Sequence, residues 1–260
     1  MTSASTLTRF LEYTQALVEA CMQHSSIVGL VLVGSTAETS RVDEWSDHDF
    51  LVITESGDQE QLRTNLSWLP DAATIAFSFR ETEHGLKVVY KSGAVLEFAI
   101  FDCTELRGCQ VNHHRLVFGG KTVEAALTVA VNNYSHQVRL DALSEFQLVL
   151  SLILIGVGRA RRGEILAAGQ HIRTHAATAL MRSLTRFLPI DNQLDTLDVW
   201  RRFEFTQPQL SKELADALSQ GPEIAALHLL KIAEKVLPPI WSEYPLENVR
   251  VIQRALAWID

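Results

Sequence analysis

Two aspartates stand two residues apart where an apolar run begins, in the segment Asp47-His48-Asp49 that leads into Phe50–Thr54. Burying carboxylates at the N-terminal end of a buried strand costs free energy unless a cation neutralises them. Because side chains alternate faces along a strand, Asp47 and Asp49 project to one side and His48 to the opposite, buried side. Paired hard oxygen ligands favour Mg²⁺, which takes its remaining ligands from water and phosphate. The pair therefore predicts metal-assisted phosphoryl or nucleotidyl transfer.

A second element of such a site precedes the aspartates. The apolar run Ile27–Val33 is short, continuous and β-branched, which predicts a buried strand that ends at Gly34-Ser35. A glycine lets the backbone approach a phosphate closely, and a serine offers an N–H and a hydroxyl. The segment "TAETS" that follows is predicted to open a short helix whose first amides face an anion. Gly34 and Ser35 are thus candidate phosphate-binding residues.

A third carboxylate is expected on a neighbouring strand to complete a metal cage. Glu97 is the single charged residue between Ala94 and Phe101, in a segment that is otherwise apolar. Asp102 competes with it, but it has the opposite parity (102 − 97 = 5) and stands at the strand end, where a cap is the usual role. We expect Glu97 to be the third ligand, and its alternative is a glutamate on an edge strand that faces water.

This combination of motifs resembles the polymerase-β-like nucleotidyltransferase superfamily. The resemblance covers Val31–Asp102, and the 12 positions from Ser35 to Asp47 (47 − 35 = 12) fit its usual spacing. Chain length, "LEFAIFD" and "RRGEILAAGQHIRTHAATALMRSL" look more narrowly like the antibiotic nucleotidyltransferases of the lincosamide and aminoglycoside groups. The sequence departs from that pattern at His48, where an aliphatic residue is usual, and at Asp49, where the lincosamide type tends to have glutamate.

The resemblance implies that the chain is an enzyme of the transferase class. Asp47, Asp49 and Glu97 would hold two Mg²⁺ ions and act as catalytic residues, and Gly34 and Ser35, together with the two aspartates, would bind the nucleotide triphosphate, with ATP as the expected co-substrate. The NMP would pass to a hydroxyl of a small molecule, such as an antibiotic, and two subunits would form a homodimer. Two alternatives stay open: transfer to a protein side chain, as in toxin–antitoxin-type enzymes, and a non-catalytic nucleotide-binding module.

The composition of the chain limits which classes of function and which location are possible. The chain has 260 residues, 47% of them hydrophobic, and a formal net charge of −8. This balance argues against non-specific binding to nucleic acid or to an anionic membrane, because both need a basic surface. The three cysteines form no metal-binding motif, the N-terminal residues lack a secretory signal, and the longest apolar run, Phe146–Val157, is too short to span a bilayer. We expect a cytoplasmic protein.

The pattern of elements predicts an α/β (α+β) protein with two domains. A mixed sheet flanked by helices is expected in a nucleotidyltransferase domain over 1–121, and helices alone in a substrate or dimerisation domain over 122–260. In the first part we expect helices over Leu7–Cys21 and Gln59–Leu69, and strands over Ile27–Val33, His48–Thr54, 73–81, 86–91 and 94–102, with a two-residue hairpin turn at Ser92-Gly93. A short piece, "RLVFGG" (115–120), closes this part of the chain. In the second we expect helices over Val123–Asn133, Ser144–Arg161, Glu164–Leu188, Thr196–Phe203, Gln209–Ser219, Glu223–Leu237 and Leu246–Trp258.

Overall fold

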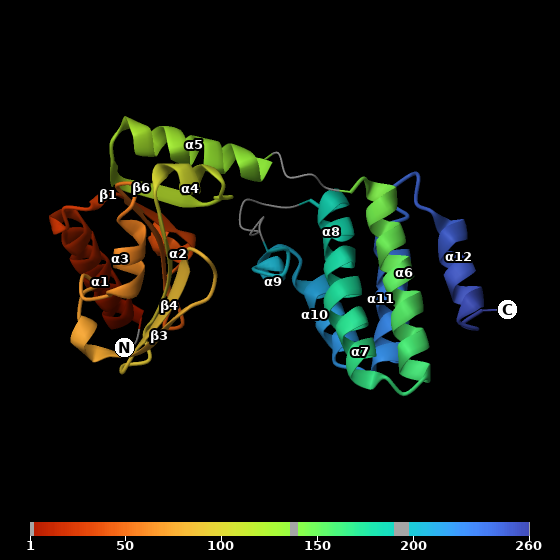
Figure 1. Cartoon of the computed structure of the whole chain (residues 1–260). Coiled ribbons are helices and arrows are strands. Elements are labelled where there is room, and N and C mark those ends of the chain that lie inside the picture. The colour runs from red at the N-terminus through yellow and green to blue at the C-terminus, as the bar shows by residue number, and fades with distance from the viewer. Residues whose placement is uncertain (1–2, 136–139, 190–197, 260) are drawn as a thin grey trace. The chain divides into compact units, whose positions relative to one another are not determined.

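A computed structural model of the chain describes residues 3–135, 140–189 and 198–259. The chain divides into two compact units, Met1–Gln137 and Val138–Asp260 (Figure 1). The division comes later than the expected boundary after residue 121, because helix α5 (Lys121–Ser135) packs against the sheet of the first unit. Its residues Val123, Ala126 and Leu127 are buried in the same cluster as Val31 of the sheet.

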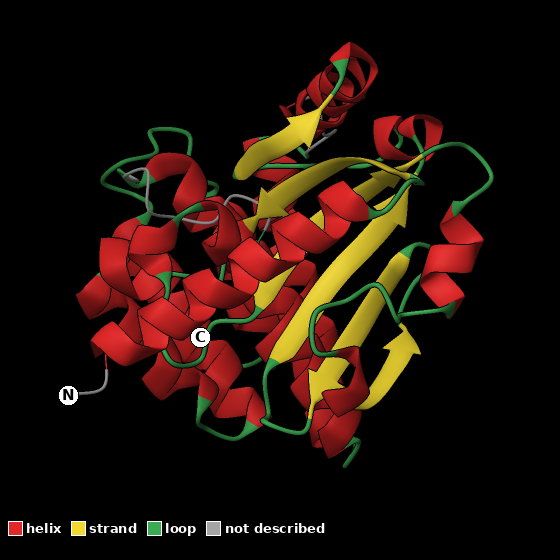
Figure 2. Ribbon diagram, turned by 90° about the vertical axis from the view of Figure 1, so that its left-hand side faces the viewer, coloured by secondary structure: helices red, strands yellow, loops and turns green. Residues whose placement is uncertain are grey.

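The first unit is built on a mixed sheet of six strands in the order β3-β4-β5-β2-β1-β6 (Figure 2). Strands β2 and β5 run parallel, and every other neighbouring pair is antiparallel. This confirms the predicted mixed sheet. The strands are β1 (Ile27–Val33), β2 (His48–Thr54), β3 (Ile75–Arg80), β4 (Gly85–Tyr90), β5 (Val95–Phe101) and β6 (His114–Gly119).

Helices cover the two faces of this sheet. On one face, α1 (Ser3–Gln23) and α3 (Gln59–Thr64) supply Leu17, Cys21 and Leu62 to a core that includes Phe50 and Phe98 of the sheet. On the other face, α4 (Cys103–Arg107) and α5 pack over Val31 and neighbouring apolar residues. The alternation of side chains along each strand thus feeds two separate cores, one on each side.

Three local features of the first unit differ from the sequence expectations. Helix α3 ends at Thr64 instead of continuing to Leu69, and the residues after it form turns before Pro70. The expected helix after Ser35 forms earlier, as the single-turn α2 (Gly34–Ala37), and it is followed by the 3₁₀ turn η1 (Thr39–Arg41).

The hairpin between β4 and β5 also differs, because its loop has three residues instead of two. Tyr90 donates its N–H to the carbonyl oxygen of Ala94 at 2.9 Å, and Gly93 adopts a left-handed φ of +88°. A three-residue loop that ends on a left-handed glycine is the next most common hairpin connection after the two-residue turns. A change of one residue in the loop moves each side chain of a strand opposite a different partner, so this detail sets the register across the site.

The second unit is entirely helical in the residues that the structure describes, as predicted. Its helices pack around one apolar core to which α6, α8, α10 and α11 all contribute. Helix α6 is long and apolar enough to cross a membrane by length and composition alone, but residues such as Phe146, Ile153 and Val157 are buried in this core. The helices are α6 (Ala142–Arg161), α7 (Ile165–Gly169), α8 (Ala177–Phe187), α9 (Phe203–Thr206), α10 (Pro208–Leu218), α11 (Pro222–Val236) and α12 (Leu246–Ala255).

Two helices of this unit differ from those predicted from the sequence. The predicted Glu164–Leu188 helix is continuous in its path but contains a π-helical segment, Gln170–Ala176, between α7 and α8. The helix predicted over Thr196–Phe203 is wrong where it can be compared: residues 199–202 form turns and α9 begins at Phe203, while 196 and 197 lie outside the described residues.

Candidate active site

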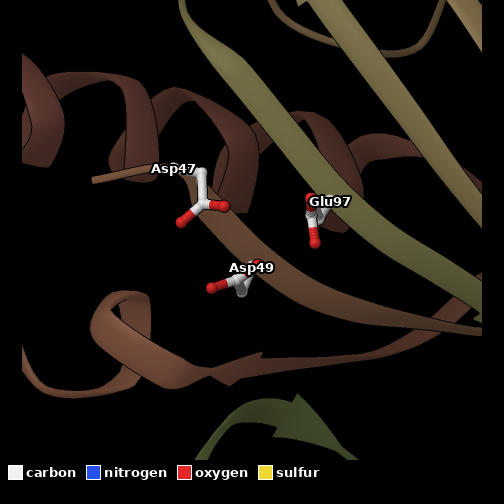
Figure 3. A group of neighbouring side chains, drawn as sticks. All are labelled: Asp47, Asp49 and Glu97. Atoms are coloured by element: carbon white, nitrogen blue, oxygen red, sulfur yellow. The ribbon is translucent and has the colours of Figure 1, made fainter. Parts of the chain in front are cut away.

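Three carboxylates converge at one end of the sheet in the first unit. One oxygen each of Asp47, Asp49 and Glu97 can be chosen so that all three lie within 4.8 Å of one another (Figure 3). All three residues are half-buried. Among the residues that the structure describes, this is the one cluster of three or more His, Cys, Asp or Glu side chains with a spacing that suits a metal ion.

The sheet topology explains this convergence. Strands β2 and β5 run parallel and pair Asp49 directly with Glu97. Paired residues on neighbouring strands point to the same face, so the two carboxylates stand side by side. Asp47 precedes β2 by one residue and shares the parity of Asp49, which brings it to the same face. The structure therefore brings together all three of the predicted metal ligands.

Gly34 lies directly against this cluster. Its φ is +57°, in the left-handed region that favours glycine, and a Cβ at this position would lie 2.7 Å from Oδ2 of Asp49. The glycine therefore has two roles: it allows the turn at the end of β1, and its lack of a side chain leaves room for the Asp49 carboxylate. Ser35, the second predicted phosphate-binding residue, follows it in α2 and is buried.

Two further residues of the site were not predicted from the sequence. Thr36 is fully buried, and its Oγ1 accepts a hydrogen bond of 2.8 Å from the backbone N–H of Asp49, which fixes the start of β2 against α2. Lys87 on β4 pairs with Glu97 across the sheet, and its Nζ lies 2.8 Å from Oε1 of Glu97. Thr36 could have been predicted as a site residue, because it directly follows Gly34-Ser35 in the sequence. Lys87 was not predictable, because its partner depends on the hairpin register.

The Lys87 ammonium is shared between two glutamates. Its Nζ lies 3.1 Å from Oε1 of Glu81 in addition to its contact with Glu97. These hydrogen bonds raise the pKa of Lys87 to about 12. Lys87 therefore stays charged at neutral pH and balances part of the negative charge on the third carboxylate.

The two residues that were weighed against the metal ligands have structural roles. Asp102 caps α4 by accepting hydrogen bonds from the N–H groups of Thr104 and Glu105, and the Glu105 side chain accepts in return from the N–H of Asp102. These bonds, that from Glu105 first, lower the pKa of Asp102. His48 points to the other face, as predicted, where it stacks on Phe10 with ring centroids 3.8 Å apart. Burial lowers its pKa to about 4.

The donor set decides which ions fit the cluster. Asp47, Asp49 and Glu97 offer carboxylate oxygens alone, without histidine or cysteine, and the absent side chain of Gly34 leaves Asp49 its space. Oxygen ligands of this kind suit Mg²⁺, Mn²⁺ or Ca²⁺ better than zinc or copper. The residues therefore fit a hard divalent cation.

No family model matches the chain, and no curated protein matches it. Solved structures similar to it include a nucleotidyltransferase-like protein from Exiguobacterium sibiricum, which is 14% identical with 86% of this chain and 74% of that chain covered and a TM-score of 0.33. An aminoglycoside 6-adenyltransferase from Bacillus subtilis is 13% identical, with 94% and 90% covered and a TM-score of 0.29. A STING-associated c-di-GMP synthase, CdnE, from Capnocytophaga granulosa is 11% identical, with 93% and 83% covered and a TM-score of 0.33. The first two carry names of the enzyme class that the sequence motifs resemble.

Proposed function

We propose that this protein is a metal-dependent nucleotidyltransferase that moves an NMP from an NTP, with ATP as the expected donor, to a hydroxyl of a small molecule. The observation that carries the proposal is the convergence of Asp47, Asp49 and Glu97, whose carboxylate oxygens lie within 4.8 Å of one another. The Lys87 ammonium balances part of the charge of Glu97, but like charges held this close still repel one another unless a further cation lies between them. The ion pair with Lys87 accounts for Glu97 in part, and the convergence of all three carboxylates favours a bound divalent cation.

Different residues of the site would bind the metal and the triphosphate. Asp47, Asp49 and Glu97 would hold Mg²⁺, which when bound neutralises negative charge on the reacting phosphate. Gly34 and Ser35 would bind the β- and γ-phosphates, since the glycine lets the backbone come close and the serine adds an N–H and a hydroxyl. Fixing the triphosphate in this way would orient its α-phosphorus for in-line attack.

The proposed transfer balances as a simple displacement. The acceptor oxygen bonds to the α-phosphorus while the bond from that phosphorus to the bridging oxygen breaks, and pyrophosphate leaves. The acceptor proton would pass to Glu97. Lys87 donates a hydrogen bond to Oε1 of this carboxylate and so holds it beside the two aspartates. The helical second unit would supply contacts that select the acceptor. A cytoplasmic location and a homodimer are further predictions from the sequence.

Transfer is tested with ATP labelled at the α-phosphate, Mg²⁺ and a panel of hydroxylated small molecules that includes aminoglycosides and lincosamides. The proposal predicts label on a small molecule, together with pyrophosphate release that needs that molecule. The Asp47→Asn/Asp49→Asn variant should lose both, while Glu44→Gln, which changes an exposed carboxylate in the loop before Asp47, should keep both. Label on protein would favour the protein-modifying alternative, and binding of ATP without turnover would favour the non-catalytic module.

A further inference from the structure

Two phenylalanine rings lie exposed on the edge strand β3. Phe77 is 55% exposed and Phe79 is 49% exposed. They stand two residues apart, so both project to the same face of the sheet. Edge strands are normally protected by charged residues, because apolar side chains on an open edge promote association with other molecules. A pair of exposed rings at this place therefore marks a candidate binding surface.

The register of the sheet places these rings on the face of the carboxylate site. Phe79 pairs with Lys87, Lys87 pairs with Glu97, and Glu97 pairs with Asp49. Since paired residues on neighbouring strands share a face, Phe79 lies in one row with the carboxylates. Phe77 begins the next row, in which it pairs with Val89, and Val89 pairs with Val95. Val89 and Val95 are half-buried. We call Phe77, Phe79, Val89 and Val95 the apolar strip.

The spacing of the strands gives the distance from this strip to the carboxylates. Neighbouring strands lie about 4.8 Å apart, so Phe79, two strands from Glu97 and three from Asp49, is about 10 to 14 Å from the carboxylates. A single small molecule that reaches the carboxylates with one end and the strip with the other must be of about this length.

Charge limits which molecules suit this surface. The cation of the row, Lys87, is already bound by Glu97 at 2.8 Å and by Glu81 at 3.1 Å. It is therefore not free to attract an acidic group. Glu81 and Glu97 bring two carboxylates to the one ammonium of Lys87, so the charge beside Phe79 is net negative, which favours a neutral or cationic molecule over an anionic one.

We propose that the apolar strip seats the non-reacting body of the acceptor. This inference rests on the proposed nucleotidyltransferase function and adds the acceptor class: a neutral or cationic alcohol with an aromatic or alkyl group about 10 Å from the reacting hydroxyl. The hydroxyl lies at the carboxylates and the apolar group covers Phe77 and Phe79.

The test uses phenyl-terminated primary alcohols of increasing length as rulers. Benzyl alcohol, 4-phenylbutan-1-ol and 6-phenylhexan-1-ol are titrated into the full chain with Mg²⁺ and ATP, and binding is measured by saturation-transfer NMR. The longest alcohol should bind most tightly to the wild type, because it spans the distance. The Phe77→Ser/Phe79→Ser variant should bind it about tenfold more weakly, since the apolar contact is lost. Phe205→Ser, which changes an exposed phenylalanine of the second unit, should bind it as the wild type does.

The same samples separate this inference from the proposed function. The rise in thermal midpoint with Mg²⁺ and ATP reports on the nucleotide site, and both variants should keep it, which also shows that they fold. Equal alcohol affinity in the wild type and the double variant would overturn the apolar strip while leaving the nucleotide site intact. A third outcome would overturn the apolar strip in favour of pairing between copies of the chain. In that outcome the wild type self-associates and binds none of the alcohols, and the double variant no longer self-associates. No rise with ATP in any protein would instead contradict the proposed function.

Discussion

At the scale of single residues, Gly34 is the position where backbone and site constrain each other most. Its φ is +57°, and an added Cβ would lie 2.7 Å from Oδ2 of Asp49. Gly34→Ala should lower the free energy of unfolding by about 1 to 2 kcal/mol because of the left-handed backbone. It should also displace the Asp49 carboxylate and weaken Mn²⁺ binding. Urea denaturation and a Mn²⁺ titration measure the two effects.

Gly93→Ala is the matched control for this substitution. Gly93 also has a left-handed φ, +88°, but a Cβ there would meet no heavy atom within 4 Å. We expect a similar loss of stability with unchanged Mn²⁺ affinity. Equal metal affinity in Gly34→Ala and the wild type would show that the contact with Asp49 has no bearing on the metal.

Asp47 should behave as a carboxylate that opposes the folded state when no metal is present. Its oxygens lie within 4.8 Å of those of Asp49 and Glu97. Like charges at this distance cost up to about 1 kcal/mol in a water-like environment. Asp47→Asn should therefore raise the thermal midpoint in EDTA and abolish the rise that the wild type shows with Mg²⁺ and ATP. A lower midpoint in EDTA would mean that Asp47 holds the loop together instead.

Much of the site could be predicted from residue types alone. Parity along a strand was enough to choose Glu97 over Asp102, and the structure brings Glu97 to the two aspartates. The missed contact of Lys87 with Glu97 shows where such reasoning ends. A two-residue turn would have placed Val88 opposite Glu97, whereas the observed three-residue loop places Lys87 there. Register between strands depends on loop geometry, which residue types only partly specify.

At the scale of elements, the first turn of α4 depends on Asp102, which accepts hydrogen bonds from the N–H groups of Thr104 and Glu105. Asp102→Ala should lower the free energy of unfolding at pH 7 by about 1 kcal/mol, as for other N-caps. The hydrogen bonds lower the pKa of Asp102 below 3.8, so its contribution is present above pH 3.8 and is lost as the pH falls through the folded-state pKa. The difference between Asp102→Ala and the wild type should therefore shrink in acid.

Urea denaturation at pH 7, 5 and 3 measures this difference. Asp102→Asn is the control, because asparagine keeps an acceptor oxygen at the cap, and it should lose much less stability at pH 7. A gap between Asp102→Ala and the wild type that stays constant with pH would contradict the role given to the charge.

Elements were predictable where one pattern dominated a segment. The strands β1 and β2 follow continuous apolar runs, and helices such as α11 lie between glycine or proline breaks, so their positions agree with the sequence. The exceptions are segments in which tertiary context decides. Helix α3 ends at Thr64, although Leu62 and Leu69 are both buried, because the residues between them turn to bring both side chains into one core.

At the scale of the whole molecule, the two units have separate cores. Leu30 lies in the core of the first unit and Ile153 in that of the second, and both are fully buried. Leu30→Ala and Ile153→Ala should each lower the stability of their own unit by about 2 to 5 kcal/mol. Calorimetry should show two transitions, each lowered by one of the substitutions. Ile153→Ala should leave Mn²⁺ affinity unchanged at a temperature where both units are folded, and a loss would mean that the metal site needs the second unit.

The overall division into a sheet-containing part and a helical part was visible in the sequence, since strand patterns come first and helical patterns follow. The place where the chain divides was not, because α5 reads as one more Ala/Leu-rich helix. Its buried residues Val123, Ala126 and Ala130 pack with strand residues of the first unit, and no local pattern distinguishes that partner from another helix. Which core a helix joins is decided by the tertiary fold.

The central claim is that the three carboxylates form a metal site for a nucleotide, and Mn²⁺ binding read by electron paramagnetic resonance tests it most directly. Mn²⁺ replaces Mg²⁺ among oxygen ligands, and its signal reports the free ion. In the presence of a non-hydrolysable ATP analogue, the wild type and Glu44→Gln should bind Mn²⁺ equally, and Asp47→Asn/Asp49→Asn should bind it at least about tenfold more weakly, as expected when two charged ligands are lost. Equal binding by all three proteins would contradict the claim.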